Sequence, residues 1–141
     1  MIINHKFCVM MITLESRDLD LCARTVTALA SDETDDLKAA LAWTLRNRFI
    51  VRARVARPSA LTICHALLRE GTGCATAALP PGPVSSDVDW CRALAINCLV
   101  WSGDLVDPTS GATSCHRHDV TAKWATRRVP TALIGAYIFL R

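Results

Sequence analysis

Side chains able to do chemistry gather at a few points of this sequence. Cysteine and histidine are adjacent at Cys64-His65 and again at Cys115-His116, where His118 follows. Thiolate and imidazole are ligands that zinc prefers, but the chain has no CxxC pair and no regular ligand spacing. A cysteine with a histidine can also form a nucleophile and its base. Adjacent residues of a strand point to opposite faces, so Cys115 and His116 cannot form that dyad themselves. We therefore predict no metal site and no cofactor.

Carboxylates are the second group of candidates. Glu33 follows the first predicted helix, and Glu70 lies near the end of a later one. A carboxylic acid in a partly apolar cleft has a raised pKa and can donate a proton as a general acid. Each glutamate can equally be a cap or a solvated surface group, while Asp32 and Asp104 are expected in turns or caps.

Helical periodicity and turn residues predict the elements that would position these groups. The first helix runs through 21–30 and is capped by Asp18 or Asp20. The next begins at Thr34, and leucines recur in it every four residues. Further helices are predicted at 61–69 and from a cap at Ser86 to a stop at Gly103. A turn at 107–111, a strand at 112–116 and a final strand at 132–140 follow. The expected fold is a helix-rich α+β domain with a small antiparallel β-hairpin.

Length and composition limit the classes of protein. The chain has 141 residues, of which 51% are hydrophobic and 21% are charged, as expected for one globular domain. We predict an arm or edge segment at 1–16 and the domain at 17–141. The net charge of +3 is too small to indicate nucleic acid, and the arginines in 46–57 have no interleaved aromatic residues. No apolar run reaches the roughly 18–20 residues that a membrane span needs.

Cysteine usage bears on the compartment. The chain has seven cysteines, and its N-terminal apolar run lacks a small-residue cleavage site, so there is no clear signal peptide. We expect most cysteines to be reduced and buried, with Cys22, Cys91 and Cys98 inside helices. Cys64 and Cys74 are candidates for a disulfide if the protein works outside a cell.

Several motifs, in order, carry a resemblance to a known family. These are Ala23-Arg24-Thr25-Val26, Lys38-Ala39-Ala40-Leu41-Ala42-Trp43-Thr44-Leu45-Arg46-Asn47-Arg48, Gly103-Asp104-Leu105-Val106-Asp107-Pro108-Thr109-Ser110-Gly111-Ala112-Thr113 and Ile134-Gly135-Ala136-Tyr137. Over 18–141 the chain resembles the SleB-type cell wall hydrolases. The resemblance implies a lysozyme-like fold, and cleavage between the amino sugars of peptidoglycan by lytic transglycosylase chemistry without a metal.

The resemblance also identifies a missing group. The family reads A-R-T-[VIL]-[YW]-G-E-A-R-G-E in its first helix, which places its catalytic glutamate at Leu29 and its second acidic residue at Glu33. Leucine has no proton to give, so Glu33 is the candidate substitute. The family's Q-F-S-C-W, whose aromatics border the groove, stands here as Gly71-Thr72-Gly73-Cys74-Ala75. The groove residues that the resemblance implies are His116, Trp124, Tyr137 and Thr113.

Two hypotheses remain open for function. The chain is a peptidoglycan hydrolase-like domain, weak or inactive because of Leu29, and its partner is a glycan strand. Alternatively, it is a catalytically inactive component of a phage or phage-like particle, with a structural or peptidoglycan-binding role and with other particle proteins as partners. Either hypothesis implies synthesis in the cytoplasm, followed by release to the envelope or incorporation into a virion-like particle.

Overall fold

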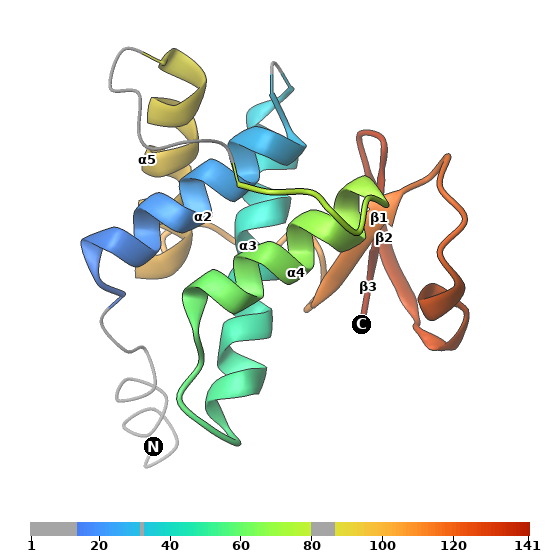
Figure 1. The fold of residues 1–141 in the computed structure, drawn as a ribbon. Helices are drawn as coiled ribbons and strands as arrows, with labels where there is room; N and C mark the ends of the chain where they lie inside the picture. Colours follow the sequence, from blue (N-terminus) through green and yellow to red (C-terminus); the bar gives the residue numbers. More distant parts are fainter. Residues whose placement is uncertain (1–13, 32, 80–86) are drawn as a thin grey trace.

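The computed structural model describes residues 14–31, 33–79 and 87–141, and shows a bundle of helices with a small sheet at one side (Figure 1). The helices are α2 (Ser16–Leu29), α3 (Asp35–Ala53), α4 (Ala60–Thr72) and α5 (Val88–Ser102). After them come β1 (Ser114–Arg117), the 3-10 helix η1 (Lys123–Arg127), β2 (Pro130–Ile134) and β3 (Tyr137–Leu140). The predicted helix-rich α+β class is confirmed.

The sheet is larger than the predicted hairpin. Its three antiparallel strands lie in the order β1-β3-β2, so β3 is central. The single strand expected at 132–140 is two strands, because the chain turns back at Gly135 with a φ of 57°, a left-handed conformation that glycine adopts without strain. Across the sheet, His116 pairs with Ile138 and Arg117 with Tyr137.

The helix termini agree with the sequence only in part. The second helix starts from Thr34 as predicted, and there the Thr34 side chain caps α3 by accepting from the amide of Leu37. The expected caps of α2 are wrong, because the helix begins earlier, at Ser16, and its N-cap residue Glu15 makes no side-chain cap bond. Ser86 lies outside the described residues. Asp87 caps α5 instead, and Gly103 ends it in the left-handed conformation with a φ of 83°.

The core lies between the helices and the inner side of the sheet. The periodic leucines of α3 (Leu37, Leu41 and Leu45) are all buried in it. Cys22, Cys64 and Cys115 are buried too, whereas Cys74, Cys91 and Cys98 are exposed. The expectation for Cys91 and Cys98 is wrong because α5 turns its other face inward, with the buried residues Ala93, Ile96, Asn97 and Val100.

The predicted N-terminal arm, 1–16, lies mostly outside the described residues, although Ser16 already belongs to α2. None of the helices that the structure describes has both the length and the apolar character required to cross a membrane.

Candidate functional site

Leu29, the last residue of α2, lies closed in the core. Its side chain is 6% exposed and packs against Gly71 of α4. A Cβ atom added to Gly71 would come within 2.8 Å of Leu29 Cδ2, so the bare glycine provides the room that the leucine fills. The Leu29 carbonyl accepts a hydrogen bond of 2.8 Å from the Tyr137 hydroxyl. Hydrocarbon therefore occupies the place where the resemblance expects an acid.

Tyr137 reaches this point from the central strand. It is 3% exposed, and burial, with smaller effects of the charges on Cys115 and Glu33, raises its pKa to about 12. Its hydroxyl is neutral at ordinary pH and is engaged with the Leu29 carbonyl. In this conformation Tyr137 ties the sheet to the end of α2, and its hydroxyl is not presented to a bound sugar.

Glu33 is exposed just beyond the end of α2. The negative charge of its carboxylate makes a small contribution to the raised pKa of Tyr137, after that of burial. Glu33 also borders a cavity of about 390 Å³ beside the start of α5, lined by Glu33, Lys38, Asp87, Val88, Asp89 and Arg92. Glu33 is therefore accessible to a ligand at this cavity.

A buried lysine holds the segment between Leu29 and Glu33. Lys38 is 1% exposed, and its Nζ donates to the carbonyls of Ala30 at 3.1 Å and Glu33 at 2.7 Å. The same Nζ lies 3.1 Å from Asp89 Oδ1. Three acceptors satisfy the three N–H groups of an ammonium, so Lys38 positions this turn. In the sequence, Lys38 is a lysine directly after a core leucine, a pattern that does not distinguish a buried lysine from a solvated one.

Glu70 does not take the place of the acid. Both of its carboxylate oxygens accept from the Arg48 guanidinium, at 2.6 and 2.9 Å. The two side chains are only 12% and 22% exposed. Both oxygens are therefore engaged in a bidentate, largely shielded ion pair. Glu70 joins α4 to α3.

His116 and Trp124 form a separate pair. Their rings meet edge to face, with centroids 5.7 Å apart, and His116 Nδ1 donates to the Arg117 carbonyl at 2.7 Å. Side chains alternate along a strand, so His116 lies on the opposite face of the sheet from Cys115 and Arg117. Cys115 is fully buried, and the charges of Glu70 on α4 and Arg48 on α3 act on its thiol. The face of the sheet that carries Cys115 therefore lies against the helices.

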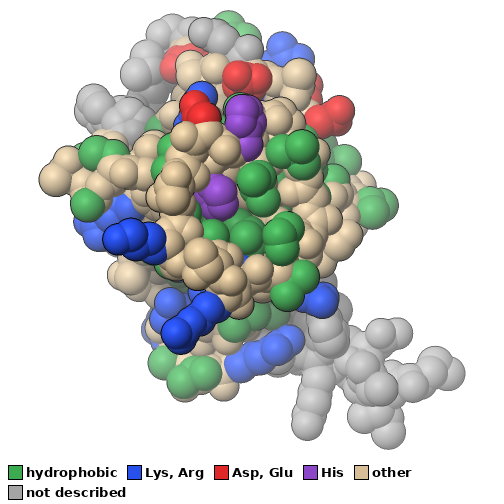
Figure 2. Space-filling model, turned by 90° about the vertical axis from the view of Figure 1, so that its right-hand side faces the viewer, with side chains coloured by type: hydrophobic (Ala, Val, Ile, Leu, Met, Phe, Trp, Pro, Cys, Tyr) green, Lys and Arg blue, Asp and Glu red, His purple; other side chains and the backbone are tan. Residues whose placement is uncertain are grey.

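The face of the sheet turned away from the helices is therefore a distinct surface, which we call the outer face. Pairing across the strands places His116, Ile138 and Leu133 in one row on it, and Trp124 packs beside His116. Leu133 is 69% exposed and Trp124 is 37% exposed. Seen from the sheet side, histidine side chains surface among hydrophobic ones (Figure 2). The predicted site residues are thus split between Leu29 with Tyr137 inside and His116 with Trp124 outside.

Thr113 belongs to a hydrogen-bonded turn before β1. The Asp107 carboxylate accepts from the Thr109 amide at 2.8 Å, the Thr109 hydroxyl at 2.6 Å and the Gly111 amide at 3.0 Å. Asn47 of α3 donates to the same carboxylate at 2.9 Å and to the Ala112 carbonyl at 3.0 Å. Thr113 then donates its amide to Leu140, at the end of β3. The motif residues of this turn, and Asn47, build the scaffold.

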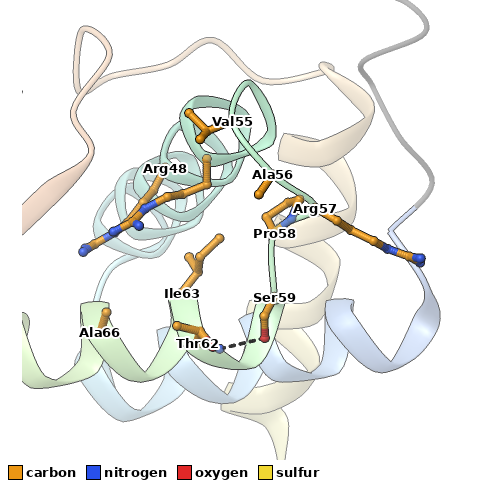
Figure 3. Close-up of a pocket in the computed structure, with 10 residues that line it drawn as sticks. Arg48, Val55, Ala56, Arg57, Pro58, Ser59, Thr62, Ile63 and Ala66 are labelled. Carbon is orange, nitrogen blue, oxygen red and sulfur yellow. Dashed lines mark hydrogen bonds between the residues drawn. The ribbon is translucent and has the colours of Figure 1, made fainter.

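A further hollow lies away from all predicted site residues, between the end of α3 and the start of α4 (Figure 3). It measures about 230 Å³ and has an apolar floor that includes Ile63 and Ala66. Arg48 and Arg57 lie at its rim, but their side chains extend in different directions (Figure 3). The cations do not converge on one point, so the hollow is no ready-made anion site. Within the described part of the chain, no three His, Cys, Asp or Glu side chains are placed to hold a metal ion.

Comparison with known proteins gives one informative likeness. No protein-family model matches the sequence, and no curated protein is significantly similar to it. Among solved structures, the catalytic domain of the SleB protein of Bacillus cereus superimposes with a TM-score of 0.56. The two are 19% identical, and the match covers 92% of this chain and 93% of that one. The chain therefore has the fold of the SleB catalytic domain.

Proposed function

We propose that this chain is a peptidoglycan hydrolase-like domain that binds glycan strands and cleaves them weakly or not at all. The shared fold, over almost the full length of both chains, supports the ancestral activity. The observation that carries the loss of cleavage is the closed packing of Leu29 against Gly71. A missing general acid costs about 10²–10⁴ in rate.

Two carboxylates were candidates to replace the acid, and their surroundings differ. Both carboxylate oxygens of Glu70 are engaged by the Arg48 guanidinium. Glu33 is exposed, and its charge acts on Tyr137, which contacts the Leu29 carbonyl. Any residual cleavage is therefore assigned to Glu33. Because Glu33 is exposed, it lacks the closed, partly apolar cleft in which a general acid is efficient, so such activity would be low.

The outer face supports the binding part of the proposal. It combines the partly exposed ring of Trp124, packed on the buried imidazole of His116, with the exposed side chain of Leu133. An exposed apolar patch with polar neighbours is typical of a ligand-binding surface. The apolar face of an amino sugar can lie on the exposed part of the Trp124 ring, which the buried His116 imidazole meets edge to face.

Two assays on purified peptidoglycan test the proposal. In co-sedimentation, we expect the wild-type chain to pellet with the sacculi and Trp124→Ala to bind at least 5-fold more weakly, about 1 kcal/mol. Val106→Ala removes a side chain that is 91% exposed elsewhere, and it should bind like wild type. In muropeptide release, we expect little or no product, and any product should disappear in Glu33→Gln but persist in Asp36→Asn.

The same assays address the alternative, a structural component of a phage or phage-like particle without a glycan ligand. Failure of the wild-type chain to pellet with peptidoglycan, while its circular dichroism shows a folded domain, would contradict glycan binding and favour that alternative. Rapid release of muropeptides by the wild-type chain would contradict the loss of cleavage.

A further inference from the structure

Cys22 and Cys64 face one another across the contact between α2 and α4. The two helices lie side by side and run in the same direction (Figure 1). Leu29 of α2 meets Gly71 of α4, and each cysteine lies seven residues before its helix's member of that contact. Seven residues are about two helical turns, so the geometry brings Cys22 opposite Cys64.

The thiols are in contact. Cys22 is 3% exposed and Cys64 is 1% exposed, and the two share a hydrogen bond. That bond raises the pKa of Cys22 and lowers the pKa of Cys64, to which the Thr25 hydroxyl also contributes. The two thiols are therefore close enough to interact, and both are shielded from solvent in the folded chain.

We infer that Cys22 and Cys64 form a disulfide between α2 and α4 when the chain folds in an oxidising compartment. The oxidant is a small disulfide of the glutathione type. While the chain is still folding and both cysteines are accessible, one thiolate of the pair attacks a sulfur of the oxidant and releases the first thiol, leaving a mixed disulfide. The other cysteine gives up its proton and attacks the protein sulfur of that mixed disulfide, which releases the second thiol. Two protein thiols are oxidised, and one small disulfide is reduced to two thiols.

The pairing of Cys64 with Cys74 that the sequence suggested is disfavoured. Cys64 lies inside α4, whereas Cys74 follows the left-handed Gly73 that ends the helix and is exposed. The eight helical steps from Cys64 to Thr72 alone rise roughly 12 Å, whereas a disulfide needs Cα atoms within about 7 Å.

The cross-link would act on the same helix pair that carries Leu29 and Gly71. Joining residues 22 and 64 closes a long loop, which restricts the unfolded chain and fastens the two helices two turns from that contact. Disulfides of this kind persist outside the reducing cytosol. The inference does not depend on glycan binding. The presence of this disulfide would indicate that the chain folds in an oxidising compartment.

Peptide mapping tests the inference on the full chain. The protein is refolded from denaturant in a mixture of reduced and oxidised glutathione, its free thiols are blocked with N-ethylmaleimide, and it is digested with trypsin. We expect peptide 18–24, which holds Cys22, linked to peptide 55–69, which holds Cys64 and retains the uncut Arg57-Pro58 bond. Oxidation should raise the melting temperature by roughly 10 °C, and dithiothreitol should reverse the rise.

Two variants control the mapping. Cys22→Ser should leave peptide 55–69 alkylated, and Cys98→Ser, at an exposed cysteine of α5, should retain the linked pair. If the wild-type chain refolds to its native circular dichroism with both thiols alkylated, or if Cys64 is linked to another cysteine, the inference is wrong.

Discussion

The turn at 107–113 and the end of α2 are each held by one charged side chain that hydrogen-bonds several backbone groups, but the charge is negative in the first and positive in the second. In the turn at 107–113, the Asp107 carboxylate gathers backbone amides, and at the end of α2 the Lys38 ammonium gathers backbone carbonyls. At the turn, the hydrogen-bonding residues are those that match the SleB-type pattern. At the end of α2, the residue of chemical interest, Leu29, is hydrocarbon packed on Gly71. Agreement with a motif can thus reflect scaffold alone.

The largest effect is expected at the end of α2. Replacing Lys38 with Met would leave the carbonyls of Ala30 and Glu33 and the carboxylate of Asp89 without this partner. We expect a loss of about 3 kcal/mol in the free energy of unfolding, measured by urea denaturation. A loss below about 1 kcal/mol would show that Lys38 does not hold this turn.

The turn at 107–113 should follow closely. Asp107→Ala removes the acceptor of four hydrogen bonds, and Asp107 is only partly buried, so we expect a loss of about 2–3 kcal/mol. Asp104→Ala serves as the control, because among the described residues its carboxylate accepts a side-chain hydrogen bond from the exposed Ser102 alone. Equal losses in the two variants would contradict the scaffolding role of Asp107.

Acid titration sharpens the same point. Burial alone would raise the pKa of Asp107, but hydrogen bonds from Thr109, Asn47 and Gly111 outweigh it and lower the pKa. A lowered folded-state pKa stabilises the fold above the unfolded-state pKa of about 4 and stops doing so as the pH falls through the folded value. The stability difference between wild type and Asp107→Asn should therefore shrink below about pH 4. A constant difference from pH 7 to pH 2 would contradict this account.

Glu70 distinguishes a structural carboxylate from a catalytic one. Glu70→Gln breaks a shielded pair with Arg48, and we expect a loss of about 2 kcal/mol without a specific effect on glycan cleavage. Asp35→Asn breaks an equally bidentate but exposed pair with Arg92 and should produce no measurable change. Should Glu70→Gln abolish cleavage at unchanged stability, Glu70 would be the acid.

The smallest effect concerns the contact between Leu29 and Gly71. Gly71→Ala gains helix propensity but forces its Cβ against Leu29 Cδ2. In a double-mutant cycle with Leu29→Ala, we expect the alanine at 71 to be more favourable by about 1 kcal/mol when the leucine is absent. A coupling of zero would mean that the two residues do not share the space.

The elements were predictable where local signals determine them. Thr34, the leucines of α3 and Gly103 locate their helices, and the packing confirms them. The turn at Gly135 was missed because a glycine inside an apolar run does not reveal on which side the chain folds back. The split of the candidate site depends on which face of a four-residue strand meets the helices, and this is set by contacts between segments distant in sequence.

The charged partners were the least predictable. A lysine in an amphipathic helix normally points to solvent. The residues near Lys38 in the sequence do not indicate its ion pair with the distant Asp89. The same holds for Arg48 and Glu70, which lie 22 residues apart. Such pairs become visible only when the helices are packed.

The most direct test of the central claim is muropeptide release from purified peptidoglycan by Leu29→Glu beside wild type and Leu29→Gln. If Leu29 occupies the place of a lost acid, Leu29→Glu should release anhydro-muramyl products at least 10²-fold faster than wild type, and Leu29→Gln should not. Circular dichroism and peptidoglycan co-sedimentation establish that each variant is folded and binds. A folded, binding Leu29→Glu that releases no product would contradict the claim, as would a wild-type chain that already cleaves as fast.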